Sequence, residues 1–372
     1  MKEVTMWQLT ENKDWAYLEN TFDWVRVMKD IPQDTQHHAE GNVAVHTQLV
    51  LQELAGLPAF QELSLPLQEV LWAAALLHDA EKYSTTVLQP DGSITSAGHA
   101  RKGEMKVRQI LYRDVPAPFL IREQIAKLVK YHGLPLWVFD KPDPRKALII
   151  ASLEVDTKLL ALLARADALG RSCADQAELL YRLDCFEELC RENECWGIPR
   201  AFATADARIQ YLLKEDNAPD YVPFEQPLMH VIMMSGLPGA GKDTYVRQHY
   251  QQLPVISLDD IRKEMKISPA DKSGNGKVIQ AAKEQARVYL RKQQSFIWNA
   301  TNITRQMREQ LISLFFTYRA AVTIVYVEVP VGKLLYQNKQ REDIVPAAAM
   351  ERMISKLEVP VITEAHEVIY FV

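Results

Sequence analysis

The segment that decides the fold of this chain reads Val231-Ile-Met-Met-Ser-Gly-Leu-Pro-Gly-Ala-Gly-Lys-Asp-Thr244. Its apolar first part predicts a strand. The spacing that follows, from Gly236 through Gly239 and Gly241 to Lys242, is that of a phosphate-binding loop that opens a helix. The glycines allow the backbone to turn tightly and aim its N–H groups inward, and the lysine reaches the outer phosphates of a nucleotide. The segment therefore predicts a site for ATP or another nucleoside triphosphate with Mg2+.

One position departs from the usual pattern of this loop. The Ser or Thr that normally follows the lysine and contacts Mg2+ is Asp243 here, and Thr244 stands directly behind it. We expect both residues to belong to the nucleotide site.

Length and composition place the chain among ordinary globular proteins. With 372 residues we expect two domains. The content of 48% hydrophobic and 24% charged residues is typical of such proteins. No apolar stretch is long enough to span a bilayer, and the start of the chain has no signal-peptide pattern, so we expect a cytoplasmic protein without a membrane partner. The four cysteines match no zinc-binding spacing, and we expect reduced thiols.

A proline-containing connection divides the chain. Residues 214–229 contain three prolines and show no periodicity, which predicts a linker. Before it, apolar periodicity predicts helices, among them 43–54, 67–77 and 156–168. After it, strands alternate with helices, which predicts a parallel sheet built from βαβ units. These strands are expected at 229–234, 254–258, 295–299, 321–329 and 367–372, with helices at 241–250 and 304–317.

The net charge is unevenly distributed. Residues 226–372 hold 19 Lys and Arg against 14 Asp and Glu, whereas the whole chain carries a formal charge of −5. A basic C-terminal half suits a polyanionic substrate, and an acidic N-terminal half suits metal binding or a solvated surface.

Histidines and acids gather in the helical half. Six of the nine histidines fall between His37 and His132. His46 and Asp167 lie on the apolar faces of their expected helices, and His78-Asp79 closes another helix that is almost entirely apolar. A lone buried imidazole is usually a satisfied core residue, but a buried carboxylate without a partner costs several kcal/mol. A metal cation would satisfy all of these positions together.

This pattern resembles the HD phosphohydrolase superfamily, and most closely the HD domain of bacterial tRNA nucleotidyltransferases. The likeness covers about residues 37–171 and rests on His38 to Thr47, Leu76 to Asp79 and Ala166 to Arg171. It implies an all-α phosphohydrolase domain with two metal ions. The ligands that it implies are His46, His78, Asp79 and Asp167 for one ion, with His99 and His132 completing a second site and His38 as a further candidate. Imidazole and carboxylate ligands together favour Mn, Fe, Co, Ni, Cu or Zn over Mg.

Lys82 stands four residues after His78. On a continuous helix the two would share a face, so the ammonium could hold a substrate phosphate. The alternative is a surface lysine.

The segment Ser257-Leu-Asp-Asp-Ile-Arg262 follows the second expected strand. An Asp at that strand end could accept a proton from an attacking hydroxyl, although Asp-Asp before a helix equally suits a helix cap. Together with the phosphate loop, the segment resembles the 5′-hydroxyl polynucleotide kinases. That resemblance implies Asp259 as general base, with Arg262 and Asn302 on the acceptor side. For Asn302 the alternative is a residue that merely ends a strand.

Residues 338–346 resemble the lid that clamps the triphosphate in these kinases. Arg341 matches one of two lid arginines, and Gln337 stands in place of the other. Either Arg341 suffices, or another cation such as Lys333 or Lys339 compensates.

The whole chain resembles the bacterial HD-Pnk family of RNA end-healing enzymes. The likeness implies a helical phosphohydrolase domain at 1–222, the end of a linker at 223–228 and an α/β P-loop kinase domain at 229–372. It also implies that RNA or DNA ends are the substrates and that a polynucleotide ligase acts alongside; a homo-oligomer remains open. Two alternatives stand: a small-molecule kinase joined to a nucleotide phosphohydrolase, and an RNA-end binding module without catalysis.

Overall fold

The computed structural model describes residues 6–214, 217–268 and 271–372 and divides the chain into two compact units, Met1–Ala201 and Phe202–Val372. Residues 215 and 216 of the predicted linker lie outside the described residues. Among the described residues, no helix is both long and apolar enough to cross a membrane. The four cysteines are free thiols, as the sequence predicts.

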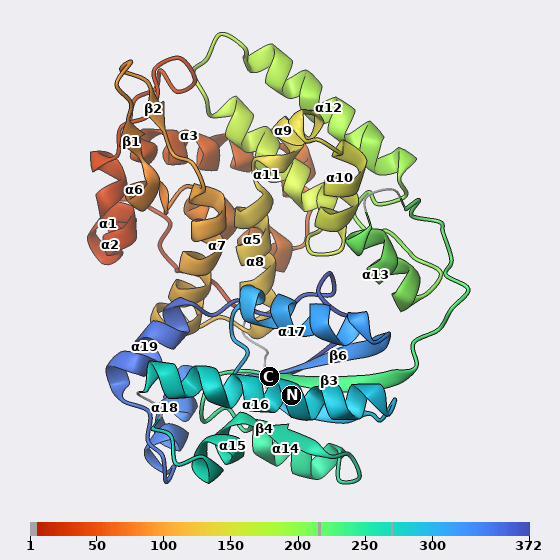
Figure 1. The fold of residues 1–372 in the computed structure, drawn as a ribbon. Coiled ribbons are helices and arrows are strands. Elements are labelled where there is room, and N and C mark those ends of the chain that lie inside the picture. Colours follow the sequence, from red (N-terminus) through yellow and green to blue (C-terminus); the bar gives the residue numbers. More distant parts are fainter. Residues whose placement is uncertain (1–5, 215–216, 269–270) are drawn as a thin grey trace, which may run out of the picture. The chain divides into compact units, whose positions relative to one another are not determined.

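The first unit is helical, with one short antiparallel pair of strands (Figure 1). Its elements are α1 (Trp15–Thr21), α2 (Asp23–Arg26), η1 (Val27–Asp30), α3 (Val43–Gly56), α4 (Pro58–Gln61), α5 (Leu65–Leu77), α6 (Lys82–Thr85), β1 (Val87–Leu88), β2 (Ile94–Thr95), α7 (His99–Gln109), the π-helical turn η2 (Ile110–Asp114), α8 (Phe119–Tyr131), α9 (Leu134–Trp137), η3 (Val138–Asp140), α10 (Pro144–Ser152), α11 (Thr157–Leu169) and α12 (Gln176–Glu192).

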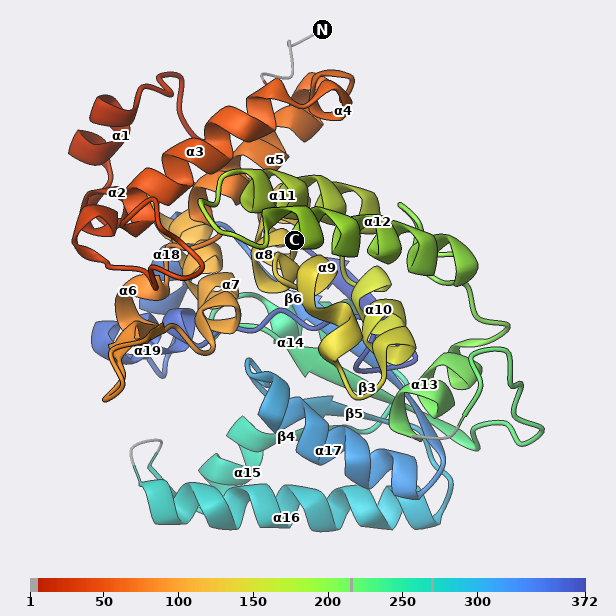
Figure 2. The same cartoon turned by 90° about the horizontal axis from the view of Figure 1, so that it is seen from above.

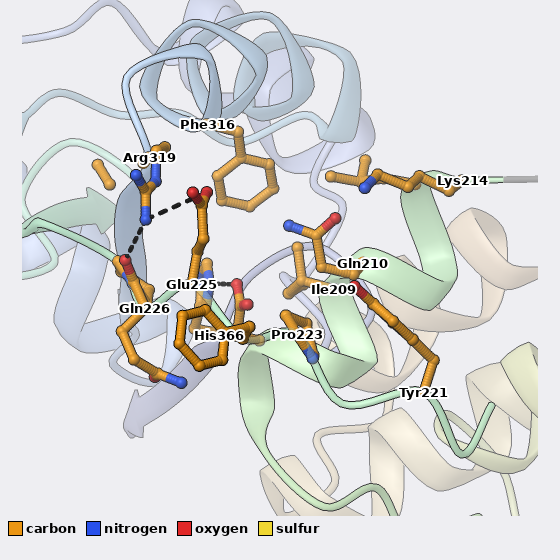
Figure 3. Close-up of a pocket in the computed structure, with 15 residues that line it drawn as sticks. Ile209, Gln210, Lys214, Tyr221, Pro223, Glu225, Gln226, Phe316, Arg319 and His366 are labelled. Atoms are coloured by element: carbon orange, nitrogen blue, oxygen red, sulfur yellow. Dashed lines mark hydrogen bonds and ion pairs between the residues drawn. The ribbon is translucent and has the colours of Figure 1, made fainter. Parts of the chain in front are cut away.

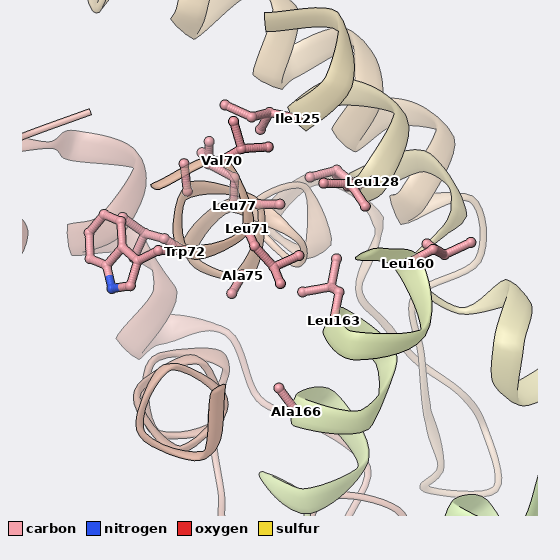
Figure 4. Close-up of a cluster of buried hydrophobic side chains, with 14 of the residues drawn as sticks. Val70, Leu71, Trp72, Ala75, Leu77, Ile125, Leu128, Leu160, Leu163 and Ala166 are labelled. Carbon is pink, nitrogen blue, oxygen red and sulfur yellow. The ribbon is translucent and has the colours of Figure 1, made fainter. Parts of the chain in front are cut away.

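Helix α5 forms the centre of this unit. Every residue from Glu69 to Leu77 is buried, as expected for a helix that is apolar all round. Figure 4 shows Leu71 and Ala75 of α5 beside side chains of α8 and α11, among them Leu128 and Leu163. The residues that directly follow α5, His78 and Asp79, are therefore carried into the interior of the unit.

The end of α11 packs directly on α3. A Cβ atom on Gly170 would lie 2.8 Å from the Val50 side chain and 2.9 Å from its backbone nitrogen, so only glycine fits at this contact. The close approach brings Asp167 of α11 to His46 of α3.

The second unit is an α/β domain with a parallel sheet, which confirms that part of the predicted fold (Figure 1). Its elements are α13 (Ala205–Leu213), β3 (Met229–Ser235), α14 (Lys242–His249), β4 (Val255–Ser257), α15 (Leu258–Glu264), α16 (Lys272–Arg291), β5 (Phe296–Asn299), α17 (Arg305–Thr317), β6 (Ala320–Val327), α18 (Val331–Lys339), α19 (Ala347–Ser355) and β7 (Glu367–Phe371).

The strand order of this sheet is β4-β5-β3-β6-β7, and all neighbours are parallel. Helices α16 and α17, which lie side by side in Figure 2, share one apolar core with one face of the sheet. Strand β3 lies in the middle of the sheet, between β5 and β6, and the phosphate loop follows its carboxyl end. Ligands of open α/β sheets bind at this edge, where the direction of winding reverses.

The division between the units lies earlier than the predicted linker. Helix α13 belongs to the second unit, because Arg208 donates to the carbonyl oxygens of Ala365 and His366 and Asp206 lies 3.3 Å from the His366 ring. Side-chain contacts of this kind leave no local pattern in the sequence, whereas the three prolines of the connection are visible in it.

A cavity of about 330 Å3 lies beside α13. Figure 3 shows it between α13, the connection around Tyr221 and Glu225, and the residues Phe316, Arg319 and His366. Because Arg319 and His366 directly precede β6 and β7, the cavity lies at the amino ends of the strands, opposite the phosphate loop. None of the predicted site residues lines it.

Candidate functional site

The six predicted metal ligands of the first unit come together at one place. They are supplied by five parts of the fold: His46 from α3, His78 and Asp79 after α5, His99 at the start of α7, His132 after α8 and Asp167 from α11. Five of the six are buried, and the His99 side chain is 24% exposed.

Asp79 lies between two groups of imidazoles. Its Oδ2 atom is 3.3 Å from His78 Nε2 and 3.9 Å from His46 Nε2. Its Oδ1 atom is 3.4 Å from His99 Nε2 and 3.9 Å from His132 Nε2. One carboxylate can therefore serve two cation sites, one on each oxygen.

Three of the imidazoles are oriented by their own backbone. In each, Nδ1 faces the carbonyl oxygen three residues earlier: His78 to Ala75 at 2.7 Å, His99 to Ser96 at 2.8 Å and His132 to Val129 at 2.8 Å. A carbonyl oxygen only accepts, so the proton lies on Nδ1 and the lone pair on Nε2. This is the arrangement of histidines that bind metal through Nε2.

The centre of the group contains polar atoms without partners. His46 Nε2, His78 Nε2 and Asp79 Oδ1 are buried and make no hydrogen bond within the described part of the chain. Leaving such atoms unpaired costs free energy, and a divalent cation would satisfy them. The nitrogen and carboxylate donors suit a transition metal better than Mg2+.

At Asp79 and His132 the electrostatics favour the forms that bind metal, whereas the Asp167 and Glu40 carboxylates raise the pKa of His46 despite its burial. Burial alone would raise the pKa of Asp79, but the Lys82 ammonium and the His78 and His99 imidazoles hold it well below its usual range. Burial lowers the pKa of His132 to about 3. The carboxylate is thus charged and this imidazole neutral at neutral pH, as metal binding requires.

Glu40 and Arg171 form a second layer around His46 and Asp167. The sequence alone does not assign these two residues to the site. Glu40 Oε1 lies 2.9 Å from His46 Nδ1, a short contact that is poorly aligned for a hydrogen bond. The other oxygen of Glu40 accepts from the Ser172 backbone at 2.9 Å. Arg171 makes two hydrogen bonds to Asp167, at 2.7 and 3.0 Å. Glu40 thus lies on the Nδ1 side of the His46 ring, and the Nε2 atom on the other side lies 3.1 Å from Asp167 Oδ1.

His38, the further metal candidate, lies one step out from Asp79. Its Nδ1 atom is 2.8 Å from Glu40 Oε1, and it forms a third potential ligand group with Glu40 and His46. The structure therefore joins His38 to the central group through Glu40.

Lys82 reaches the cluster in a way that differs from the prediction. The continuous helix expected through His78 and Lys82 is wrong: α5 ends at Leu77, and Lys82 begins α6. Its ammonium lies 2.8 Å from Asp79 Oδ2 and donates to Gln33 Oε1 at 2.5 Å. Lys82 is buried beside the carboxylate, which excludes the surface alternative.

The phosphate loop of the second unit adopts the backbone that its glycines predict. Gly236, Gly239 and Gly241 all have positive φ angles, of 141°, 82° and 104°. A Cβ on Gly236 would lie 2.3 Å from the Val327 carbonyl oxygen, so the loop can approach β6 only with glycine there.

Lys242 lies inside this loop. Its ammonium donates to the carbonyl oxygens of Gly236 and Leu237 at 2.9 and 3.0 Å. Burial lowers its pKa to about 8, and the charges of Asp243, Arg341 and Asp259 act on it as well. The four predicted side chains thus share one electrostatic environment.

The two residues that follow the lysine, Asp243 and Thr244, make different contacts. Asn299, at the end of β5, donates to the Asp243 carboxylate at 2.7 Å. Thr244 is exposed, and its hydroxyl lies 3.4 Å from Arg247 Nη2. A carboxylate is a ligand that suits Mg2+, so Asp243 fits the metal that accompanies the nucleotide.

Asp259 is free of the capping role that remained open. Ser257 caps α15, because its hydroxyl accepts from the Asp260 backbone at 3.2 Å. Asp259 and Asp260 are exposed in the first turn of that helix. Asp259 Oδ1 lies 2.5 Å from Arg262 Nη1, which keeps the proposed base and the proposed acceptor ligand together.

The Asn302 side chain bonds the carboxyl end of β3. It is buried, has φ 44° and donates its amide to the Met234 carbonyl oxygen at 2.7 Å. Its own carbonyl oxygen accepts from Ser235 and Arg308. These contacts give it the alternative role, that of a residue fixing the strand ends.

The last turns of α18 lie close to the phosphate loop. A Cβ on Gly239 would come within 3.4 Å of the Asn338 backbone nitrogen. The Asn338 side chain bonds Val345 in both directions, at 2.8 and 3.1 Å, and so closes the loop that carries Arg341. Gln337 Oε1 is buried without a hydrogen-bond partner in the described residues.

Comparison with known proteins finds similarity in the second unit. Residues 231–360 match the family model described as an AAA domain. Among solved structures, the chain is similar to a candidate kinase from Chloroflexus aurantiacus, with 17% identity, 39% of this chain and 88% of that chain covered and a TM-score of 0.33. A sugar kinase from Janibacter sp. HTCC2649 shows 16% identity, coverage of 38% and 85%, and a TM-score of 0.30. The family match and the loop geometry agree on a P-loop nucleotide-binding domain.

Proposed function

We propose that the protein repairs broken RNA or DNA ends with two active sites. The first unit would hydrolyse 2′,3′-cyclic phosphate or 2′-phosphate ends, and the second would transfer the γ-phosphate of a nucleoside triphosphate to 5′-hydroxyl ends. The observation that carries this proposal is the presence, in one chain, of a buried group of histidines around Asp79 and a phosphate loop whose lysine is subject to the charges of Asp259 and Arg341.

The first unit suits hydrolysis of a phosphate ester. A divalent metal bound there would supply Lewis acidity, which makes water a better nucleophile and offsets phosphate charge. The chain's own residues would hold three imidazoles with their lone pairs facing Asp79 and keep that carboxylate ionised. Lys82 and Arg171 add positive charge beside the carboxylates, where an anionic substrate gains from it.

The second unit suits phosphoryl transfer. The acceptor hydroxyl forms a bond to the γ-phosphorus, the bond to the leaving diphosphate breaks, and Asp259 takes the hydroxyl proton. Lys242 and Arg341 would neutralise the phosphates, as expected for this reaction. Arg262 pairs with Asp259 until an acceptor phosphate competes for its guanidinium.

The alternative in the second unit is a small-molecule kinase, because the same loop and the same base serve that chemistry. Arg262 distinguishes the two. For a polynucleotide acceptor, Arg262→Ala should raise the KM for a 3′-phosphorylated nucleoside by about 10- to 150-fold, since a lost charged contact costs on the order of 1.5–3 kcal/mol. It should change little for a bare nucleoside. Lys292→Ala, an exposed cation of the same unit, is the matched control.

The experiment that tests the proposal uses purified protein and RNA with labelled ends. Phosphate on the 5′ end should appear only with a nucleoside triphosphate and Mg2+, and opening of the cyclic phosphate only with a transition metal. Phosphorylation of sugars or nucleosides with no activity on RNA would favour the small-molecule alternative. Tight binding of RNA ends without turnover would favour the binding module.

A further inference from the structure

The phosphate loop carries a carboxylate where a neutral hydroxyl is usual. Asp243 follows Lys242 in the first turn of α14 and is exposed. The Asn299 amide, from the buried end of β5, donates to Asp243 Oδ1 at 2.7 Å. Asn299 is the one side chain that hydrogen-bonds this carboxylate within the described ranges. The contact bridges 56 positions of sequence and fixes the carboxylate beside the loop.

A carboxylate changes what the loop can bind without a metal. A serine or threonine hydroxyl is neutral and can donate to a phosphate, whereas a carboxylate at neutral pH only accepts. The negative charge of Asp243 therefore repels the β- and γ-phosphates when no cation lies between them. With a divalent cation in place, the same charge becomes an attractive oxygen ligand, because Mg2+ prefers carboxylate and phosphate oxygens.

We propose that Asp243, oriented by Asn299, makes nucleotide binding at this site conditional on a divalent cation. The kinase site would take the metal–nucleotide complex and reject the metal-free nucleotide. This inference rests on the proposed nucleotide site and not on the nature of the acceptor.

An acid in the first turn of a helix has a simpler role, since it interacts favourably with the helix dipole. That role stabilises α14 but leaves the coupling between metal and nucleotide unchanged. The bond from Asn299 favours the binding role, because it holds the carboxylate from another strand of the sheet.

The test measures how tightly a non-hydrolysable ATP analogue binds, without any acceptor. Full-length protein is freed of metals and titrated by calorimetry with the analogue, with and without Mg2+. Mg2+ should strengthen binding by a factor about 10- to 100-fold larger in the wild type than in Asp243→Ser, which is the usual range of coupling between two ligands. Asp243→Ser should also bind the metal-free analogue more tightly than the wild type does.

Two further variants sharpen the result. Asn299→Ala should reduce the coupling partly, because the carboxylate stays but loses its orientation. Asp260→Asn, which removes an exposed carboxylate of the neighbouring helix, should keep the wild-type coupling. Equal Mg2+ dependence in the wild type and in Asp243→Ser would overturn the inference and leave the proposed RNA kinase untouched. Failure to phosphorylate RNA, with the coupling intact, would overturn the proposed RNA kinase and leave the role of Asp243 standing.

Discussion

The group around Asp79 and the group around Lys242 are prepared for their ligands in different ways. In the first, three imidazoles are oriented by carbonyl oxygens of their own turns, and three polar atoms at the centre are buried without a hydrogen-bond partner among the described residues. In the second, the charged groups lie nearer solvent and bond one another or the loop, as Asp259 does with Arg262 and Lys242 with Gly236.

The difference shows what each ligand has to contribute. The donors of the first group already surround the two oxygens of Asp79, so cations can bind there without breaking contacts within the protein. The second must exchange contacts within the protein for contacts with phosphates. We therefore expect the activity of the first site to depend mainly on added metal. In the second site, we expect turnover and nucleotide affinity to depend on pH and on its partly exposed charged residues.

The largest expected effect is that of metal removal. Chelator-stripped protein should lose the phosphoesterase activity, and Mn, Ni, Co or Cu should restore it where Mg does not, because the donors include imidazoles. Elemental analysis and end-labelled RNA measure both. Full hydrolysis in Mg2+ alone, with no transition metal detected, would contradict the ligand assignment.

Asp259→Asn should lower kinase turnover by about 10²–10⁴-fold, since the shape is kept and the proton acceptor lost. Asp260→Asn should change turnover little, because Ser257 caps α15 through the Asp260 backbone N–H and the Asp260 carboxylate takes no part in that contact. Single-turnover kinetics on a 5′-hydroxyl RNA give both values. An Asp259→Asn enzyme with near wild-type rate would place the base elsewhere.

Glu40→Gln should weaken metal binding to the first unit by about 10- to 100-fold, the usual effect of changing a residue that orients a metal ligand. The amide cannot offer acceptors to both the His46 ring and the Ser172 backbone. Competition with a fluorescent chelator measures the affinity, with the exposed Glu62→Gln as control. Unchanged affinity would limit Glu40 to packing.

The smallest expected effect is a pH dependence of nucleotide binding. Burial lowers the pKa of Lys242 to about 8, so the free site loses its ammonium above that pH. Nucleotide affinity should then fall towards about tenfold per pH unit, because binding requires uptake of one proton. The sign for folding is opposite: since the folded pKa lies below the unfolded value, this group adds stability as pH rises from about 8 towards 10.5.

Calorimetric titration between pH 7 and 9.5 tests this. Lys242→Arg should bind more weakly at neutral pH but show no such fall. A flat profile for the wild type would mean that the lysine stays charged in the free site.

The helical first unit, the parallel sheet of the second and the choice of most candidate residues could be predicted from local patterns. The apolar run before Gly236 and the fully apolar α5 carry their structure within a few neighbours, and the histidines stand out because buried acids accompany them. The contacts of Glu40, Asn299 and α13 could not be predicted, because their partners are set by packing between elements distant in sequence. The continuous helix predicted through His78 and Lys82 is wrong because a turn at residues 78–81 interrupts an otherwise helical spacing.

We propose that one chain carries two independent end-healing sites. The most direct measurement follows both ends of one RNA, with a 5′-hydroxyl and a 2′,3′-cyclic phosphate, in the wild type, Lys242→Ala and Asp79→Ala. We predict that Lys242→Ala abolishes 5′ phosphorylation and spares opening of the cyclic phosphate, and that Asp79→Ala does the reverse. Loss of both activities from either single change in a protein that stays folded, or a wild type that modifies neither end, would contradict the account.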